Sequence, residues 1–276
     1  MASFSADPDP LTSGVPLTKG NSRVKHARKL ARRVSRTDER LFLAEGPNAV
    51  EAALSRSGGV VEVFADAAAG TTYAALRELA GERWTTVDDA ALASMCDTVH
   101  PQGVVAVCNF LDIPVGTALA GEPRLVAICA DVRDPGNAGT VIRCADAVGA
   151  DAVVLAGQSV DAYNPKTVRA TVGSLFHLPV AVEADPAEAV RAAQRAGLRV
   201  LAADGAGELD LFGAEELLAE PTAWLFGNEA WGLSDELADL ADHRVSIPIH
   251  GRAESLNLAT AAAVCLYASA RAQRRR

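Results

Sequence analysis

The chain has 276 residues, of which 49% are hydrophobic, enough for the buried cores of one large domain or two ordinary ones. The net charge of −9 alone argues against a nucleic-acid partner, but eight of the 26 basic residues lie within residues 21–40 and four within 271–276. Because salt limits the reach of distant charges to roughly 10 Å, these two basic segments can still bind a polyanion.

The sequence contains no recognisable targeting or metal-binding pattern. The N-terminal segment lacks the basic-then-apolar layout of a secretory signal, and the apolar stretch at 256–270 is too short and alanine-rich to span a bilayer. The cysteines show neither a Cys-x-x-Cys pairing nor a metal-ligand spacing, so we expect reduced, buried thiols, no metal and a soluble cytoplasmic protein. They are Cys96, Cys108, Cys129, Cys144 and Cys265.

Residues 1–20 are rich in proline and small polar residues, which predicts a disordered tail. A helix capped by Asn21 or Ser22 is expected to follow, with Val24, Ala27, Leu30, Ala31 and Val34 on its apolar face. A solvated surface helix would explain such a pattern, but its basic face has no interleaved acid, which favours contact with RNA. That face comprises Lys25, Arg28, Lys29, Arg32, Arg33 and Arg36.

The remainder of the first half alternates strand and helix patterns. Strands are expected at 41–47, 60–64, 84–87 and 104–110, with helices at 48–55 and 73–80. This alternation predicts a compact α/β domain over residues 21–113. The proline and glycine residues of 114–123 indicate a linker.

The second half predicts a larger α/β domain over residues 124–276. A strand at 125–130, a helix from about 138 to 148 ended by Gly149, and a strand at 152–156 form a β-α-β unit, which implies parallel pairing. Further strands are expected at 198–203, 222–226 and 244–249. A long helix from Leu256 closes the chain.

Polar, glycine-rich segments follow several of these strands. Ligands of α/β sheets bind at such strand ends, because backbone N–H and C=O groups there are free to face them. We therefore expect one composite site. The segments are Asp134-Pro-Gly-Asn-Ala-Gly-Thr-Val-Ile-Arg143, Phe226-Gly-Asn-Glu-Ala-Trp-Gly-Leu-Ser234 and Ile247-Pro-Ile-His-Gly-Arg-Ala-Glu-Ser-Leu-Asn257.

Two common nucleotide sites are not supported. The glycines near Asp134 do not have the Gly-x-Gly-x-x-Gly spacing, and no acid ends the strand at 152–156, which argues against a nicotinamide enzyme. The absence of Gly-Lys-Ser/Thr excludes a P-loop.

The polar residues of these segments have structural as well as functional interpretations. Asn137 either caps its helix or faces a ligand, and Ser255 either caps the last helix or acts with Asn257. Arg143 lies in an otherwise apolar helix, so its guanidinium is expected to need an anionic partner, either Glu229 or a ligand phosphate.

Other charged and titratable residues are assigned more simply. Lys166 and Arg169 place two cations near Ser174, which matches an anionic substrate. His177 and His250 have no ligand-spaced Cys or carboxylate and are interpreted as structural.

The three segments resemble motifs 1, 2 and 3 of the SpoU (TrmH-like) RNA 2′-O-ribose methyltransferases. These are Asn-x-Gly-x-x-x-Arg, Gly-x-Glu-x-x-Gly-Leu-Ser and Ile-Pro-x-x-Gly-x-x-Glu-Ser-Leu-Asn, and they recur in the family's order and spacing across roughly residues 124–273. Residues 164–179 also match the connection between motifs, whereas Asn228 and Trp231 occupy variable positions. More loosely, the N-terminal half resembles the L30e-like substrate domain of rRNA-directed members.

The resemblance implies a SPOUT fold: a mostly parallel sheet with helices on both faces and a C-terminal trefoil knot, an exception to the rule that chains do not thread loops. It also implies a homodimer through the catalytic domain that binds S-adenosylmethionine (AdoMet). The cofactor contacts carried over are Ala203, Gly227, Ile247 and Leu256, and the catalytic residues are Arg143, Asn137, Glu229, Ser255 and Asn257.

The implied reaction is 2′-O-methylation of a ribose in structured RNA, with 23S rRNA favoured because the sizeable basic N-terminal domain suits structured rRNA. We expect Arg143 to stabilise the forming alkoxide, since a guanidinium is a poor base, and base action by an arginine perturbed by a phosphate is the alternative. The alternatives are a tRNA 2′-O-methyltransferase and a non-catalytic RNA-binding protein. A base methyltransferase is disfavoured, because no motif that reads or attacks a base is visible.

Overall fold

The structure is a computed structural model that describes residues 15–275. The chain divides into two compact units. The first comprises the chain up to Phe110 together with Tyr163–Phe176, and the second comprises Leu111–Ala162 and His177–Arg276. The segment 114–123, predicted as a linker, contains the short helix α7 (Val115–Ala118) and belongs to the second unit.

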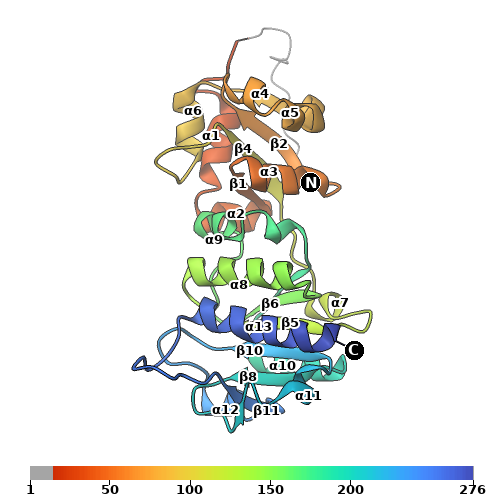
Figure 1. The fold of residues 1–276 in the computed structure, drawn as a ribbon. Coiled ribbons are helices and arrows are strands. Elements are labelled where there is room, and N and C mark those ends of the chain that lie inside the picture. The colour runs from red at the N-terminus through yellow and green to blue at the C-terminus, as the bar shows by residue number, and fades with distance from the viewer. Residues whose placement is uncertain (1–14, 276) are drawn as a thin grey trace. The chain divides into compact units, whose positions relative to one another are not determined.

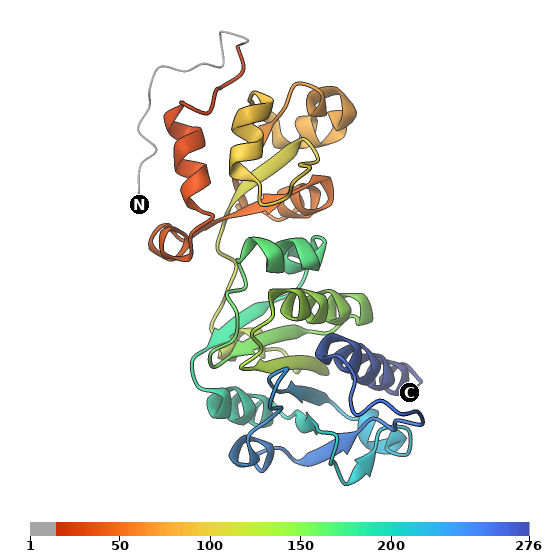
Figure 2. The ribbon, with the colours of Figure 1, turned by 90° about the vertical axis from the view of Figure 1, so that its left-hand side faces the viewer.

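The first unit is an α/β domain with a four-stranded mixed sheet in the order β1-β4-β2-β3. Strand β4 is antiparallel to β1 and β2, and β3 is parallel to β2. Its elements are α1 (Ser22–Lys29), α2 (Arg33–Glu39), β1 (Leu41–Glu45), α3 (Pro47–Ser55), β2 (Val60–Ala65), α4 (Ala69–Thr72), α5 (Ala74–Ala80), β3 (Trp84–Thr86), α6 (Asp89–Met95), β4 (Val104–Asn109) and α9 (Pro165–Thr171). Helices α1 and α6 pack on one face of the sheet, where Figure 2 shows them side by side.

The single helix predicted to follow its cap at Asn21 or Ser22 is two helices, α1 and α2. The predicted apolar face holds in α1, where Val24 and Ala27 are buried, and at its C-cap Leu30, but Ala31 and Val34 are exposed. Arg36 explains the break: its guanidinium donates to the carbonyl oxygens of Leu30 and Ala31 at 2.9 and 2.8 Å. These bonds satisfy carbonyl groups at the end of α1 that would otherwise lack partners.

Residues 1–14 of the predicted disordered tail lie outside the described part of the chain. The prediction is wrong at Leu17, which forms a parallel bridge with Val87 and is buried. Its backbone N–H donates to Thr86 and its carbonyl accepts from Asp88. Leu17 packs in the core beside α1, so burial of its side chain outweighs the local composition.

The second unit carries a seven-stranded sheet in the order β7-β6-β5-β10-β8-β11-β9, and every pairing is parallel. The mostly parallel sheet predicted from the sequence is therefore confirmed. Its remaining elements are β5 (Leu125–Ala130), α8 (Pro135–Val148), β6 (Ala152–Ala156), β7 (Val180–Glu183), α10 (Pro186–Arg195), β8 (Arg199–Ala203), β9 (Leu209–Asp210), α11 (Glu215–Leu218), β10 (Thr222–Phe226), α12 (Asp235–Ala238), β11 (His243–Ser246) and α13 (Leu258–Arg274).

Helices cover both faces of this sheet (Figure 1). Helices α8 and α13 lie together on one face, where the Trp224 indole N–H donates to the Ser269 hydroxyl at 2.9 Å. Helices α7 and α10 pack on the other face against alternate strand residues such as Ile128 and Val154. Burial on both faces explains why the strands are apolar throughout rather than alternating. The trefoil knot stays a prediction.

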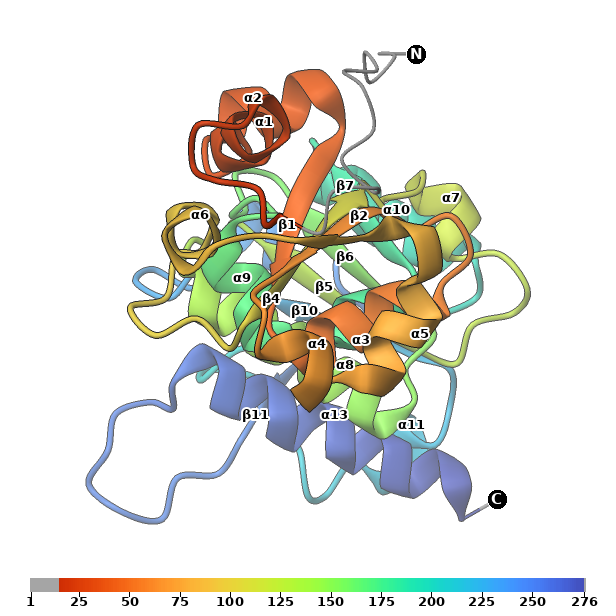
Figure 3. The ribbon, with the colours of Figure 1, turned by 90° about the horizontal axis from the view of Figure 1, so that it is seen from above.

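The boundaries near the polar segments differ from those predicted. Helix α8 starts three residues earlier than expected, at Pro135, because Asp134 caps it by accepting the Asn137 N–H at 2.8 Å. Strand β11 ends at Ser246, so residues 247–257 form a long loop before α13 (Figure 3). This loop follows the carboxyl end of a strand, where ligands of parallel sheets bind.

The segment Tyr163–Phe176 belongs to the first unit although it lies within the sequence of the second. The Tyr163 ring stacks on Phe110 with centroids 3.8 Å apart, and the Phe176 ring lies 5.9 Å from that of Phe42. Gly173, at φ +97°, is close enough to Asn48 that a Cβ there would lie 3.2 Å from its carbonyl oxygen. Aromatic packing therefore fixes the segment in place.

Candidate active site

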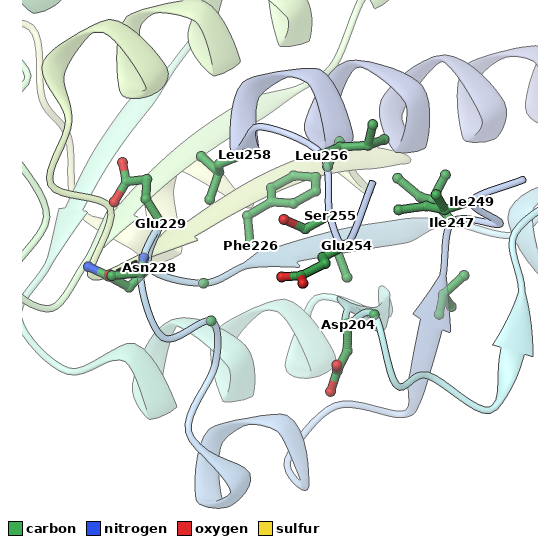
Figure 4. A pocket seen from close by; sticks show the side chains of 17 residues that line it. Asp204, Phe226, Asn228, Glu229, Ile247, Ile249, Glu254, Ser255, Leu256 and Leu258 are labelled. Carbon is green, nitrogen blue, oxygen red and sulfur yellow. Dashed lines mark hydrogen bonds between the residues drawn. The ribbon is translucent and has the colours of Figure 1, made fainter. Parts of the chain in front are cut away.

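Loops at the carboxyl ends of β8, β10 and β11 surround a cavity of about 320 Å³. Ala203, Gly227, Ile247 and Leu256, the residues predicted to contact a cofactor, all line this cavity. Figure 4 shows Glu229 at one end of the cavity and Ile247 at the other. Three segments that are far apart in the sequence thus form one concave site.

A chain of hydrogen bonds joins the three polar segments beside the cavity. The Asn137 side-chain amide donates to Glu229 Oε1 at 3.2 Å, and the Asn257 amide donates to Asn137 Oδ1 at 3.1 Å. Asn257 Oδ1 in turn accepts the backbone N–H of Ala259 at 2.9 Å. We call Glu229, Asn137 and Asn257 the amide relay.

The direction of the amide relay follows from its two ends. An ionised carboxylate only accepts hydrogen bonds, so Asn137 must turn its NH₂ group toward Glu229 and its oxygen toward Asn257. Asn257 must then donate to Asn137, which leaves its own oxygen to cap the N-terminus of α13. Each amide is oriented by its neighbours, and the three loops are held in one arrangement.

Glu229 is held in its charged form. Partial burial acts to raise the pKa of its carboxyl group, but the backbone N–H groups of Arg133 and Asp134 and the Asn137 amide outweigh this effect, and the net pKa is lowered. Those backbone bonds measure 3.1 and 2.9 Å. The amide relay is therefore complete at neutral pH, and its contribution is lost as the pH falls through this lowered pKa.

The turn carrying Glu229 is closely fixed by its backbone. Asn228 and Gly232 exchange two backbone hydrogen bonds of 2.9 Å, and the Asn228 amide donates to the Asp131 carbonyl at 2.7 Å. Gly227 lies so close that a Cβ there would be 2.4 Å from the Gly232 carbonyl carbon. Only glycine fits at position 227, because the obstacle is backbone and cannot rotate away.

Arg143 lies outside the cavity. We expected its guanidinium to be buried and therefore to need an anionic partner, and this expectation was wrong. The residue is exposed on α8, so its guanidinium is not buried and does not require an anion from the protein. The Glu229 carboxylate is instead bonded to Asn137 and to backbone N–H groups. Six residues of helix rotate Arg143 about 120° from Asn137 and move it about 9 Å along the axis.

The helix caps also differ from those expected. Asp134 caps α8 and Asn257 caps α13, so neither Asn137 nor Ser255 is an N-cap. Ser255 lines the cavity together with Glu254. Its position is consistent with ligand contact.

Most of the predicted RNA-binding residues of the first unit are exposed. They are Lys25, Arg28, Lys29, Arg32, Arg33 and Lys166. Arg36 is the exception, because it is 2% exposed and bonded to backbone carbonyls, so its assignment to an RNA-facing surface was wrong. Arg169 is part-exposed and pairs with Asp97 at 2.8 Å and with Glu45 at 3.7 Å, within the first unit.

Sequence reasoning missed several residues that shape the site, namely Asp204, Glu254 and Leu258 on the cavity wall and Arg133, whose backbone N–H binds Glu229. Asp204 directly follows the strand that ends at Ala203, and this position could have identified it. Glu254 is a fixed position of motif 3, and that motif could have identified it, whereas nothing in the pattern distinguishes Leu258.

Within residues 15–275, no group of three or more His, Cys, Asp and Glu side chains is arranged to hold a metal ion. None of the helices in that range is both long and apolar enough to cross a bilayer. The five cysteines are unpaired, and burial raises the pKa of the Cys96 and Cys129 thiols to about 12.

The fold and the site together define a two-unit α/β protein with a small-ligand cavity at the carboxyl ends of a parallel sheet. The chain belongs to the SpoU rRNA Methylase family, whose match covers residues 124–267. Residues 21–106 match the MRM3-like substrate binding domain.

Among its relatives, the Bacillus subtilis 23S rRNA (guanosine(2553)-2′-O)-methyltransferase RlmP is 35% identical over 250 residues, covering 90% of this chain and 95% of RlmP. The Streptomyces viridochromogenes 23S rRNA (uridine(2479)-2′-O)-methyltransferase is 43% identical over 142 residues, covering 50% and 49% of the two chains.

Solved structures extend the likeness to both units. The SpoU methyltransferase AviRb from Streptomyces viridochromogenes, in complex with the cofactor AdoMet, has a TM-score of 0.81 at 31% identity, covering 93% of this chain and all of AviRb (100%). The AdoMet-bound rRNA methyltransferase from Sinorhizobium meliloti has a TM-score of 0.80 at 33% identity, covering 91% and 95%.

Proposed function

We propose that the protein transfers a methyl group from AdoMet to a ribose 2′-hydroxyl of structured RNA, with 23S rRNA as the substrate. The observation that carries this proposal is the amide relay of Glu229, Asn137 and Asn257, which joins the three family motifs beside a cavity of about 320 Å³. Relatives named as 23S rRNA 2′-O-methyltransferases support it.

The residues around the cavity fit AdoMet. Ligand cavities in proteins typically hold about 300–1,000 Å³. The apolar side chains of Phe226, Ile247 and Leu256 suit an adenine ring, and the carboxylates of Asp204 and Glu254 suit ribose hydroxyls and a positive charge. These residues, with the backbone at Gly227, would hold the cofactor.

When bound, AdoMet supplies an electrophilic methyl group, and the protein must orient the hydroxyl that attacks it. The 2′-oxygen gains negative charge as its proton passes to solvent water, and it carries that charge until the new O–C bond forms. An arginine guanidinium stays protonated in proteins, so Arg143 would stabilise that charge rather than remove the proton. Its exposure on α8 leaves it open to an RNA ribose and phosphate. Asn137, on the same helix, is held by the amide relay.

Replacing Arg143 tests this role. Arg143→Ala is expected to lower the rate of methyl transfer by about 10²–10³-fold, the usual loss when one such donor is removed. The AdoMet Kd should be unchanged, because Arg143 does not line the cavity. Transfer of radiolabelled methyl groups to 23S rRNA and isothermal titration calorimetry measure the two quantities.

Arg191→Ala is the matched control, since Arg191 is an exposed arginine on α10, which covers the other face of the sheet. Its rate should equal that of the wild type. Normal turnover by Arg143→Ala would remove Arg143 from the mechanism.

The choice of RNA separates the remaining alternatives. Comparing 2′-O-methylated positions in rRNA and tRNA from cells with and without the protein identifies the substrate. If the positions whose methylation depends on the protein lie in tRNA alone, the tRNA alternative is favoured. A chain that binds RNA but not AdoMet would favour the non-catalytic alternative.

We further infer that the protein works in the cytoplasm as a homodimer through its second unit. Support for the dimer comes from exposed aromatic residues on that unit, Phe212 and Tyr267, which line an apolar groove with Leu211 and Val264.

A further inference from the structure

Trp231 differs from the other tryptophans of the chain. Its side chain is 62% exposed, whereas Trp84 and Trp224 are 7% and 0% exposed. Single exposed apolar residues are common, so exposure alone does not mark a site. The position of Trp231 does set it apart: its neighbours Ala230 and Gly232 both line the cavity, and Glu229 of the amide relay is two residues away.

The backbone that carries Trp231 is fixed. It lies inside the turn closed by the two bonds between Asn228 and Gly232, and Asn228 Oδ1 accepts the Ala230 N–H at 2.8 Å. The Asn228 amide also ties the turn to the end of β5 through the Asp131 carbonyl. The indole is thus presented to solvent from a preorganised turn, which lowers the entropic cost of binding a partner.

A cation lies over the same ring. The Arg133 guanidinium carbon is 5.6 Å from the Trp231 ring centroid, a cation–π distance. The backbone N–H of Arg133 is bound to Glu229 Oε2. The amide relay therefore fixes the position of Arg133, and the turn fixes that of Trp231. An exposed aromatic ring and an exposed cation lie together beside the motifs that hold the cavity.

We propose that Trp231 and Arg133 form a clamp for one nucleotide of the RNA, with the base stacked on the indole and the guanidinium on its phosphate. Proteins bind unpaired RNA bases by stacking them on aromatic rings, while arginine supplies the charge for the backbone. A stacked base needs no specific hydrogen bond, so the clamp would position the RNA without reading its sequence. The proposed function enters this proposal at one point, since it identifies which RNA the clamp would bind.

The single exposed tryptophan provides a direct measurement. Titrating wild-type protein with a short single-stranded oligoribonucleotide should quench tryptophan emission saturably, because the two buried rings do not contact the RNA. Trp231→Phe should lose this quenching while its Kd for the oligoribonucleotide, followed by filter binding, stays within about twofold of the wild type. Trp231→Leu keeps an apolar side chain without the ring and should weaken binding about tenfold or more.

The kinetic readout separates positioning from a structural role. The substrate for this assay is the unmodified RNA that the protein methylates. Trp231→Leu should raise KM for this RNA with little change in kcat or in the AdoMet Kd. Trp231→Phe should have the KM of the wild type. Arg133→Gln should weaken binding and make the slope of log Kd against log salt concentration shallower by about one, the value for a single phosphate.

Wild-type affinity for the oligoribonucleotide in Trp231→Leu would overturn the clamp. Tryptophan emission that changes with protein concentration rather than with RNA would also overturn it, because a second copy of the protein would then cover the Trp231 ring. The proposed function fails separately. If the protein methylates no RNA, oligoribonucleotide quenching that is lost in Trp231→Phe still supports the clamp. If it methylates RNA and Trp231→Leu behaves as the wild type, only the clamp fails.

Discussion

The shape of the cavity depends on the absence of a side chain at Gly227. Its alanine variant would drive a methyl group into the backbone of Gly232, which closes the turn carrying Glu229. Overpacking of this kind costs about 1–3 kcal/mol. We expect Gly227→Ala to move the turn and to raise the AdoMet Kd by about tenfold or more, measured by calorimetry.

Gly116→Ala is the control for Gly227→Ala, because a Cβ at Gly116 in α7 meets nothing within 4 Å. Circular dichroism melts of both variants report whether the fold survives. An unchanged AdoMet Kd in a folded Gly227→Ala protein would contradict the claim that the close approach of Gly227 to the Gly232 backbone shapes the cavity.

At the scale of single residues, the sequence predicted which polar groups meet better than what each one does. Asn137, Glu229 and Asn257 were named from their motifs, and the structure brings them into one relay. Capping was misassigned, because Asn257 and Ser255 are equally good candidates and only the start of α13 decides between them. The exposure of Arg143 depends on which face of α8 meets the sheet, and the burial of Arg36 accompanies its hydrogen bonds to the end of α1.

At the scale of elements, the basic surface of α1 is the clearest target for RNA. Replacing Lys25, Arg28 and Lys29 with glutamine removes exposed charges without touching the buried side of the helix. We expect weaker RNA binding at all sequences and a shallower dependence of log Kd on log salt concentration, by roughly 0.7–0.9 for each phosphate that the helix no longer neutralises. Filter binding at several salt concentrations measures both.

Arg77→Gln on α5 is the matched control, since it removes one exposed charge elsewhere on the first unit. Deleting residues 1–40 would be a poorer experiment, because it also removes Val24 and Leu30 from the core. Unchanged RNA affinity in the triple variant, with an unchanged salt slope, would show that α1 is a solvated surface helix.

Elements with a long apolar pattern were predicted well. The β-α-β arrangement of β5, α8 and β6 was predicted, with Gly149 as the residue that ends the helix. The left-handed φ of 72° at Gly149 agrees with that prediction. Strand β7 and helix α10 were not predicted, because four residues are too few to establish an alternation and an alanine-rich amphipathic helix lacks large apolar residues. The order of the strands depends on long-range pairing, which local sequence does not encode.

At the scale of the whole molecule, the proposed homodimer predicts an effect of charge in the groove of the second unit. Tyr267 and Phe212 are 55% and 65% exposed there. Burying such side chains on association contributes about 25 cal/mol per Å² of apolar surface, and a charge in the interface cancels that gain. Tyr267→Glu should therefore shift the mass measured by light scattering from dimer toward monomer.

The control for Tyr267→Glu is Val99→Glu, at a highly exposed apolar position of the first unit, and it should leave the mass unchanged. A wild-type protein that stays monomeric at all accessible concentrations would remove the dimer from the proposal.

The packing of Tyr163–Phe176 bears on how the protein is made. The chain passes between its two units after Phe110, after Ala162 and again after Phe176. On the ribosome, the first 110 residues emerge with Phe42 and Phe110 still lacking the rings of Tyr163 and Phe176. The N-terminal half therefore cannot finish folding during its own synthesis, and must wait until the nascent chain has grown past residue 176 and cleared the exit tunnel.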